Sequence, residues 1–215
     1  MKIALVGATG YVGAKLLEEA VNRGHVVTAI MRSPHKLPQN DLVLPAPADV
    51  TDVKALTRNF RGQDAIIHAY APPRTDSVAE RIEQQRAGTQ AIIAAAKRAG
   101  VKRILAVGGA GTLEVAPGVR NMDRPEFPAA WEGGAKSTAV IKELLLAEPG
   151  LEWTFLSPSH DLFPGKRTGK FRLGRDQMLV GPDGQSRISV EDYAVAMIDE
   201  LEDQKHTGHR FTVGY

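Results

Sequence analysis

The chain has no cysteine, almost no net charge and no long apolar run at its start, and each absence excludes a class of protein. Without cysteine it can hold neither a disulfide framework nor a thiolate metal site. Its 27 basic and 25 acidic residues leave a formal charge of +2, so the composition does not call for a nucleic-acid partner. The first apolar run, at residues 3–6, is far shorter than a signal-peptide core or a membrane span. We therefore expect a cytoplasmic protein that binds neither nucleic acid nor membrane.

The residues that are present predict one α/β domain. A chain of 215 residues is long enough for one sizeable hydrophobic core and short for two, so we assign 1–215 to a single domain. Apolar runs of strand length alternate with longer stretches of helical periodicity, which is typical of a doubly wound parallel sheet covered by helices on both faces. The expected strands are 2–6, 25–31, 42–44, 64–70, 103–107, 152–156 and 210–213, and the expected helices include 53–60, 78–99, 135–147 and 193–201.

The C-terminal part is less regular. Proline and glycine are concentrated in residues 157–169, and Gly181-Pro182-Asp183-Gly184 is typical of the turn of a hairpin. We predict that 157–188 forms a loop and hairpin region on the substrate side. Ser189 stands three residues before Asp192 and is expected to cap the last helix. His206 and His209 have no third ligand in view, so we expect no metal site.

The motif GATGYVG, at residues 7–13, follows the first strand and opens a helix. Gly7, Gly10 and Gly13 have the spacing of a dinucleotide-binding loop. The first glycine permits a tight turn, the second lets backbone N–H groups approach a diphosphate, and the third lets helix and strand pack closely. An ordinary glycine turn is the alternative, but the order of strand, loop and helix favours a nucleotide site. Tyr11 and Lys15 then flank the phosphates, so their Tyr-x-x-x-Lys spacing does not mark a catalytic pair.

The end of the second strand predicts which dinucleotide binds. A carboxylate there, roughly 20 residues after the loop, would bond the ribose 2′-hydroxyl of NAD and repel the 2′-phosphate of NADP. This strand ends instead in Met31-Arg32-Ser33, with Lys36 nearby and no acid before Asp41. Arg32 can bind a phosphate through two parallel hydrogen bonds, and Ser33 adds a donor. We predict NADP(H) in preference to NAD(H); a solvated arginine at a strand end is the alternative for Arg32.

Five motifs in order resemble one known family: GATGYVG, MRSPHKL at 31–37, ADVTD at 48–52, AGVKRILAVGGAG at 99–111 and WTFLSPS at 153–159. The chain resembles the atypical short-chain dehydrogenases with an NAD(P)-binding domain, including their NmrA-like and flavin or biliverdin reductase branches. The resemblance implies that Asp49 lies by the adenine and that the end of the fourth strand lines the nicotinamide ribose. A turn residue that caps the next helix is the alternative for Asp49. The predicted cofactor-binding residues are Gly7, Thr9, Gly10, Tyr11, Val12, Gly13, Arg32, Ser33, Asp49, Val50, Ala69, Tyr70, Ala71 and Gly108.

The chain also departs from that family. Active members of the wider superfamily carry a serine or threonine after the fifth strand and Tyr-x-x-x-Lys on the next helix. In this chain the nearest hydroxyl after that strand is Thr112, the next helix has no tyrosine, and Gln85 replaces the usual asparagine. His160 stands where flavin-reducing relatives can carry a histidine after a proline. We name His160 and Thr112 as candidate catalytic residues; an ordinary loop histidine is the alternative for His160.

The missing proton relay narrows the chemistry. Reduction of a ketone needs a positioned proton donor, whereas hydride transfer to a flavin, quinone or linear tetrapyrrole gives a delocalised anion that water can protonate. We predict an NADP(H)-dependent oxidoreductase that reduces a small conjugated acceptor. The alternative is an NmrA-like redox sensor, which binds the dinucleotide and a partner protein without turnover. Dehydrogenation or epimerisation of a sugar nucleotide is disfavoured by the absent tyrosine.

Overall fold

Eight strands form the central sheet of the protein, a computed structural model that describes residues 1–34, 37–75 and 77–215. The order across the sheet is β10-β12-β8-β5-β4-β1-β2-β3, and neighbouring strands run parallel except for β10 against β12. The strand order reverses beside β1, which pairs with β4 on one side and β2 on the other, so a ligand crevice is expected at the carboxyl ends of these strands. The strands are β1 Lys2–Val6, β2 Val26–Met31, β3 Val43–Pro47, β4 Ala65–His68, β5 Arg103–Val107, β8 Glu152–Pro158, β10 Arg172–Gly174 and β12 His209–Gly214.

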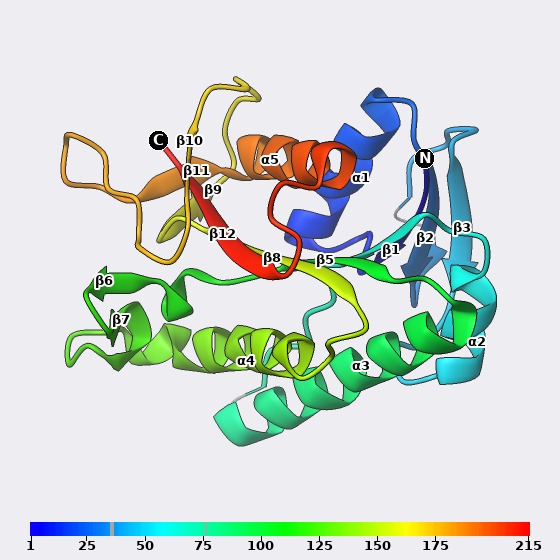
Figure 1. Cartoon of the computed structure of the whole chain (residues 1–215), viewed down its shortest axis with the longest axis horizontal. Helices are drawn as coiled ribbons and strands as arrows, with labels where there is room; N and C mark the ends of the chain where they lie inside the picture. Colours follow the sequence, from blue (N-terminus) through cyan, green and yellow to red (C-terminus); the bar gives the residue numbers. More distant parts are fainter. Residues whose placement is uncertain (35–36, 76) are drawn as a thin grey trace.

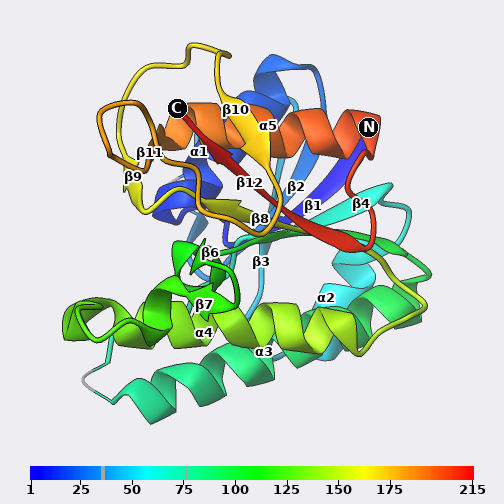
Figure 2. The same ribbon diagram turned by 60° about the vertical axis from the view of Figure 1, so that its left-hand side comes forward.

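Helices cover both faces of the sheet (Figures 1 and 2). One face carries α1 and α5, which pack against each other, and the other carries α2, α3 and α4. Adjacent residues of β4 show the division, because Ile67 belongs to the apolar cluster under α1 and α5 while Ile66 belongs to the cluster under the other three helices. This arrangement confirms the predicted doubly wound α/β fold. The helices are α1 Tyr11–Asn22, α2 Val53–Phe60, α3 Val78–Ala99, α4 Ala129–Leu146 and α5 Val190–Asp203.

Local capping fixes where the long helices begin and end. The Ser77 hydroxyl accepts a hydrogen bond from Glu80 N at 3.2 Å at the start of α3, and Gly100 ends that helix with a φ of 77°, a conformation that favours glycine. The Ser189 hydroxyl accepts from Asp192 N at 3.1 Å, which confirms the predicted cap of α5. Among the residues described, no helix is both long enough and apolar enough to cross a membrane.

Helix α4 begins at Ala129, six residues before the predicted start at residue 135. Gly133 and Gly134 lie inside its second turn, and glycine costs an exposed helix about 1 kcal/mol relative to alanine. The sequence pattern therefore hid the first part of the helix. Helix α4 is stabilised instead by packing against α3 and by the burial of Ile141 and Leu145 in the apolar cluster on that face of the sheet.

The turn of the predicted hairpin within 157–188 is present, and Gly181 N donates across it to Gln185 O at 2.7 Å. Gly184 N donates to Gly181 O at 3.0 Å. The strands on either side of the turn have different partners, because β10 pairs with β12 while β11 (Arg187–Ser189) pairs with β9 (Asp161–Phe163). Turn residues specify the local bend, but the pairing of three-residue strands is decided by tertiary contacts.

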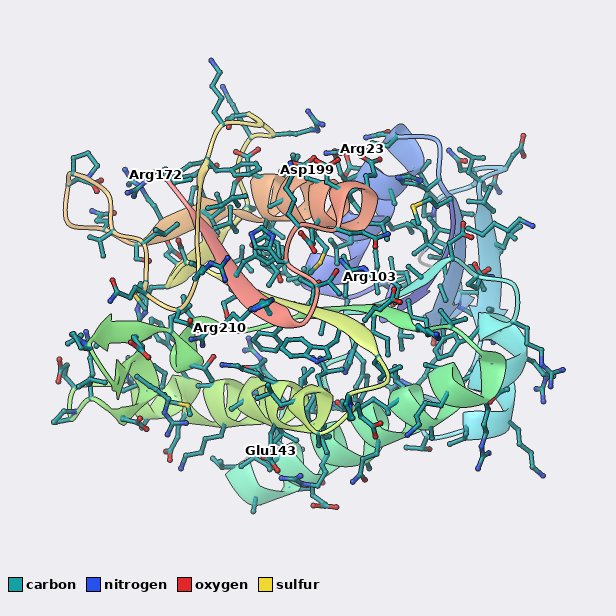
Figure 3. The ribbon with its side chains drawn as sticks, in the orientation of Figure 1. Arg23, Arg103, Glu143, Arg172, Asp199 and Arg210 are labelled. Carbon is teal, nitrogen blue, oxygen red and sulfur yellow. The ribbon has the colours of Figure 1, made fainter. Side chains whose placement is uncertain are left out.

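A buried ion pair joins α5 to the sheet. Arg103 on β5, labelled in Figure 3, donates through Nη2 to Glu200 Oε1 at 2.8 Å, and the two side chains are only 4% and 2% exposed. Thr154 Oγ1 on β8 donates to the same carboxylate at 3.1 Å. The Glu200 carboxylate is surrounded by donors, and neither Arg103 nor Glu200 lines the cavity described below.

Candidate functional site

The carboxyl ends of β1, β2, β4 and β5 open into a cavity of about 680 Å³, a size typical of ligand pockets. Val6, Met31 and Val107 come from strand ends, and further wall is supplied by α3 and α4. All predicted cofactor-binding residues line this cavity except Gly13, Ser33 and Gly108. The two predicted catalytic residues, His160 and Thr112, are not part of its lining.

The glycine loop is shaped by close backbone contacts. Gly7 has a φ of 90°, and a Cβ on this residue would lie 2.6 Å from Ala69 O. A Cβ on Gly13 would lie 2.0 Å from Gly7 O, so α1 packs against the loop more closely than any side chain would allow. Gly13 therefore shapes the loop from behind, and Gly10, the N-cap of α1, lies at the cavity wall.

The first turn of α1 presents backbone donors that have no acceptor among residues 1–34, 37–75 and 77–215. Ala14 N is the first N–H of the helix to reach a carbonyl one turn back, at Gly10 O and 2.9 Å. The N–H groups of Tyr11, Val12 and Gly13 precede it, and Gly10 has no side chain to cap them. Orphan donors at the positive end of a helix dipole fit the diphosphate of a nicotinamide dinucleotide.

Tyr11 and Lys15 are not arranged as a proton relay. The Tyr11 hydroxyl donates to Leu162 O at 3.3 Å, while Lys15 Nζ pairs with Glu18 at 2.9 Å and with Glu191 at 3.4 Å. Burial raises the pKa of Tyr11, and the negative charge of Glu191 raises it further. A phenol that donates a proton near neutral pH needs a lowered pKa, so this tyrosine is a poor acid.

Arg32, Asp49 and Tyr70 meet at the part of the cavity beside the ends of β2 and β3. Asp49 Oδ1 accepts from the Thr51 hydroxyl at 2.6 Å and from Thr51 N at 2.9 Å. These hydrogen bonds hold the pKa of Asp49 below its ordinary value, and the charge of Arg32 adds to the effect. Asp52, rather than Asp49, caps α2 by accepting from Ala55 N at 2.9 Å.

Two other predicted phosphate contacts stand apart from this group. Ser33 is exposed and is not part of the cavity lining. Lys36 lies outside the described residues.

Buried polar side chains connect α3 and α4 at the cavity wall, and sequence reasoning missed most of them. Ser137 Oγ donates to Gln85 Oε1 at 3.3 Å, and Gln85 Nε2 donates to Thr89 Oγ1 at 3.2 Å. Thr89 Oγ1 lies 3.0 Å from Nε2 of His68 at the end of β4. Burial lowers the pKa of His68 to about 4, so its ring is neutral near pH 7.

Tyr70 is held in place beside this series of hydrogen-bonded side chains. Gln85 Nε2 also lies 3.4 Å from Tyr70 O. The Tyr70 ring lies against Gly88 of α3, where a Cβ would be 2.5 Å from Cε1 of the ring. Gly88 therefore makes the space that the aromatic side chain fills.

Thr112 and His160 occupy separate positions outside the cavity lining. Arg210, labelled in Figure 3, donates to Thr112 O at 2.6 Å and to its hydroxyl at 3.1 Å, so Thr112 is buried in a structural contact. His160 Nδ1 lies 3.2 Å from Asn121 Nδ2, and its ring meets the Trp131 ring edge-on with centroids 5.0 Å apart. Burial lowers the pKa of His160, and Arg124 lowers it further. Because Thr112 is buried against Arg210 and does not line the cavity, the geometry argues against a catalytic role for it.

Comparison with known proteins agrees with this geometry. A family described as NAD(P)H-binding matches residues 7–201. The uncharacterized protein YwnB of Bacillus subtilis is 39% identical over 217 residues, which cover 99% of this chain and 98% of the relative.

Two solved structures extend the likeness to the whole fold. A proposed epimerase from Bacteroides thetaiotaomicron is 44% identical, with a TM-score of 0.90 and coverage of 100% of this chain and 96% of the other. A proposed NADH-flavin reductase from Streptococcus pneumoniae is 33% identical, with a TM-score of 0.84 and coverage of 100% and 99%. The resemblance inferred from the motifs is confirmed, and the chain belongs to the NAD(P)H-binding family.

Proposed function

We propose that this protein is an NADP(H)-dependent reductase of a small conjugated acceptor, such as a flavin or a quinone. The observation that carries the proposal is one continuous cavity, which joins the backbone donors of α1 to a second polar wall built by α3 and α4. That wall contains Gln85, Ser137 and Thr138 but no tyrosine paired with a lysine. An acceptor that delocalises the charge it gains does not need such a pair.

The residues of the chain have separate tasks in this reaction. Bound NADPH supplies the hydride. The N–H groups of Tyr11 and Val12 hold the diphosphate, and Arg32 binds the 2′-phosphate. The Ser137 hydroxyl already donates a hydrogen bond to Gln85, so its oxygen accepts a hydrogen bond from a ligand N–H. Positioning of the two reactants supplies most of the rate enhancement in such a site.

His160 is not part of the cavity lining, and it is our candidate for orienting the part of the acceptor that extends beyond the cofactor cavity. Asn121 Nδ2 faces His160 Nδ1 and also lies 3.5 Å from Ala110 O, which assigns it as the donor. The His160 proton is then on Nε2, where it can be donated to a carbonyl. Trp131, whose side chain is half exposed, offers a flat apolar surface beside that ring.

We also propose that the protein prefers NADP(H) to NAD(H) and is located in the cytoplasm. Arg32 directly follows β2 and lines the cavity at the place where NAD-binding chains carry a carboxylate. The solved relative from Streptococcus pneumoniae, a proposed NADH-flavin reductase, supports the class of acceptor.

Anaerobic assays with NADPH and a panel of flavins, quinones and aldehydes test the proposal. We expect oxidation of NADPH with flavins or quinones and none with simple aldehydes. The variant Gly13→Ala, which disturbs the glycine loop, should abolish the activity, and Gly150→Ala should retain it because its Cβ would meet nothing within 4 Å. If the protein binds NADPH but none of the acceptors in the panel leads to its oxidation, the reductase proposal fails. A sensor that binds a partner protein is then favoured.

A further inference from the structure

Arg81 is a cation on the cavity wall that has no carboxylate partner among the described residues. It projects from the first turn of α3, and its Nε is buried with no hydrogen bond to any residue that the structure describes. Two other cations of the same helix are paired, since Arg86 contacts Glu143 at 3.3 Å and Lys97 contacts Glu148 at 2.8 Å, whereas Arg98 is exposed to solvent. A buried donor left unpaired is destabilising, and because Arg81 lines the cavity, a ligand bound there can supply the acceptor.

Gln84 presents an unpaired acceptor next to this donor. It lies three residues after Arg81, which puts the two side chains on the same face of α3, and both line the cavity. The Gln84 amide donates through Nε2 to Glu80 Oε1 at 2.9 Å, while its Oε1 is buried with no partner in the described part of the chain. The wall therefore offers a cation and a hydrogen-bond acceptor side by side.

Helix α4 leaves space for the Arg81 guanidinium. A Cβ on Gly134 would lie 3.5 Å from Arg81 Nη2, and one on Gly133 would lie 3.6 Å from Arg81 Cδ. Any side chain longer than alanine at these positions would reach the guanidinium. The same helix carries Ser137 and Thr138 one turn later, so Arg81 lies close to the polar wall where the acceptor is expected.

We propose that Arg81, with Gln84, binds an anionic group of the acceptor, which makes the substrate a planar conjugated molecule bearing a carboxylate, sulfonate or phosphate. The planar fork of arginine pairs with such groups through two parallel hydrogen bonds, and Gln84 Oε1 receives a neighbouring N–H or O–H of the same ligand. This inference rests on the proposed reductase function. The inference extends the proposed function to the charge of the substrate, because a conjugated acceptor alone would not require a cation on this wall.

Matched pairs of acceptors test the charge directly. The wild type, Arg81→Gln and the control Arg86→Gln are assayed with a naphthoquinone sulfonate and with the uncharged naphthoquinone, and again with FMN and riboflavin. We expect Arg81→Gln to raise KM for the charged member of each pair at least about tenfold, as the loss of a charge-assisted hydrogen bond should, and to change KM for the neutral member less than about twofold. Arg86→Gln removes the same charge from the same helix at a residue outside the cavity lining and should change neither.

Equilibrium binding separates the failure of this inference from the failure of the reductase proposal. Naphthoquinone sulfonate is titrated into the complex of each variant with NADP⁺, and NADPH affinity is measured alongside. Weaker sulfonate binding in Arg81→Gln alone would support the anion site even if no acceptor is turned over. Equal effects on charged and neutral acceptors, or a loss confined to NADPH affinity, would overturn it, the latter by making Arg81 a cofactor contact.

Discussion

Ser137 Oγ on α4 donates to Gln85 Oε1 on α3 across 3.3 Å, and both side chains are almost fully buried at the cavity wall. The other end of the Gln85 amide is directed at Thr89 Oγ1 and Tyr70 O, which fixes the orientation of the amide. Since the Ser137 hydroxyl donates its hydrogen to Gln85, only the lone pairs of its oxygen are available to a ligand. The hydrogen bond between α3 and α4 thus makes Ser137 a hydrogen-bond acceptor toward a ligand in the cavity.

We expect Ser137→Ala to lower the free energy of unfolding by about 1–3 kcal/mol, because Gln85 Oε1 would remain buried without a donor. Thr138→Val is the matched control. The Thr138 hydroxyl bonds only to carbonyls of its own helix, at Gly134 O and Ala135 O, so its loss should cost clearly less. Urea denaturation measures both variants. Equal losses would show that the bond between Ser137 and Gln85 contributes nothing specific.

Gly13→Ala should weaken binding of NADPH more than about tenfold. The added Cβ would lie 2.0 Å from Gly7 O, so the loop backbone has to move away from the geometry that presents the α1 donors. Gly150→Ala introduces the same methyl group where nothing lies within 4 Å. Calorimetric titration with NADPH compares the two. Unchanged affinity in Gly13→Ala would remove the glycine loop from the cofactor site.

Arg32→Glu should reduce NADPH affinity at least about tenfold while changing NADH affinity less than about twofold, because the carboxylate repels only the 2′-phosphate. Arg58→Glu on α2 makes the same change of net charge at an exposed residue outside the cavity lining and should leave both affinities unchanged. Fluorescence titration of the two dinucleotides checks this. Parallel losses for NADPH and NADH would contradict the assignment of Arg32 to the 2′-phosphate.

The stability of the protein should fall as the pH is lowered from about 6.5 to 4, in part because of His68. Burial depresses its folded pKa to about 4 from an ordinary value of 6.5, so in this interval the unfolded chain binds a proton that the folded chain excludes. The full depression corresponds to about 3 kcal/mol. Urea denaturation across this interval should show a smaller decline for His68→Gln than for the wild type. The same slope in both proteins would mean that His68 titrates normally in the folded state.

The fold was predictable because its signals are local. The strand at Lys2–Val6 and the helices at Val53–Phe60 and Val78–Ala99 agree with the predicted bounds, since apolar periodicity and caps define them without reference to distant residues. The glycine loop carries its own spacing as well. The start of α4 was missed because Gly133 and Gly134 interrupt the helical propensity that the pattern relies on.

The far wall of the cavity was not predictable in the same way. Gln85 and Ser137 are 52 positions apart, and only the packing of α3 against α4 brings them into contact. Gln85 attracted notice as a substitution for asparagine, whereas Arg81 and Ser137 carry no motif. Arg81 acquires meaning only from what surrounds it, namely the two glycines of α4 and the lack of a carboxylate partner among the described residues.

A structure determined after growth with NADPH tests the central claim most directly. The account predicts a dinucleotide in the cavity, with diphosphate oxygens within hydrogen-bond distance of Tyr11 N and Val12 N, the 2′-phosphate at Arg32, and the nicotinamide beside Ser137. A dinucleotide bound elsewhere, or none in this cavity at saturating concentration, would contradict it.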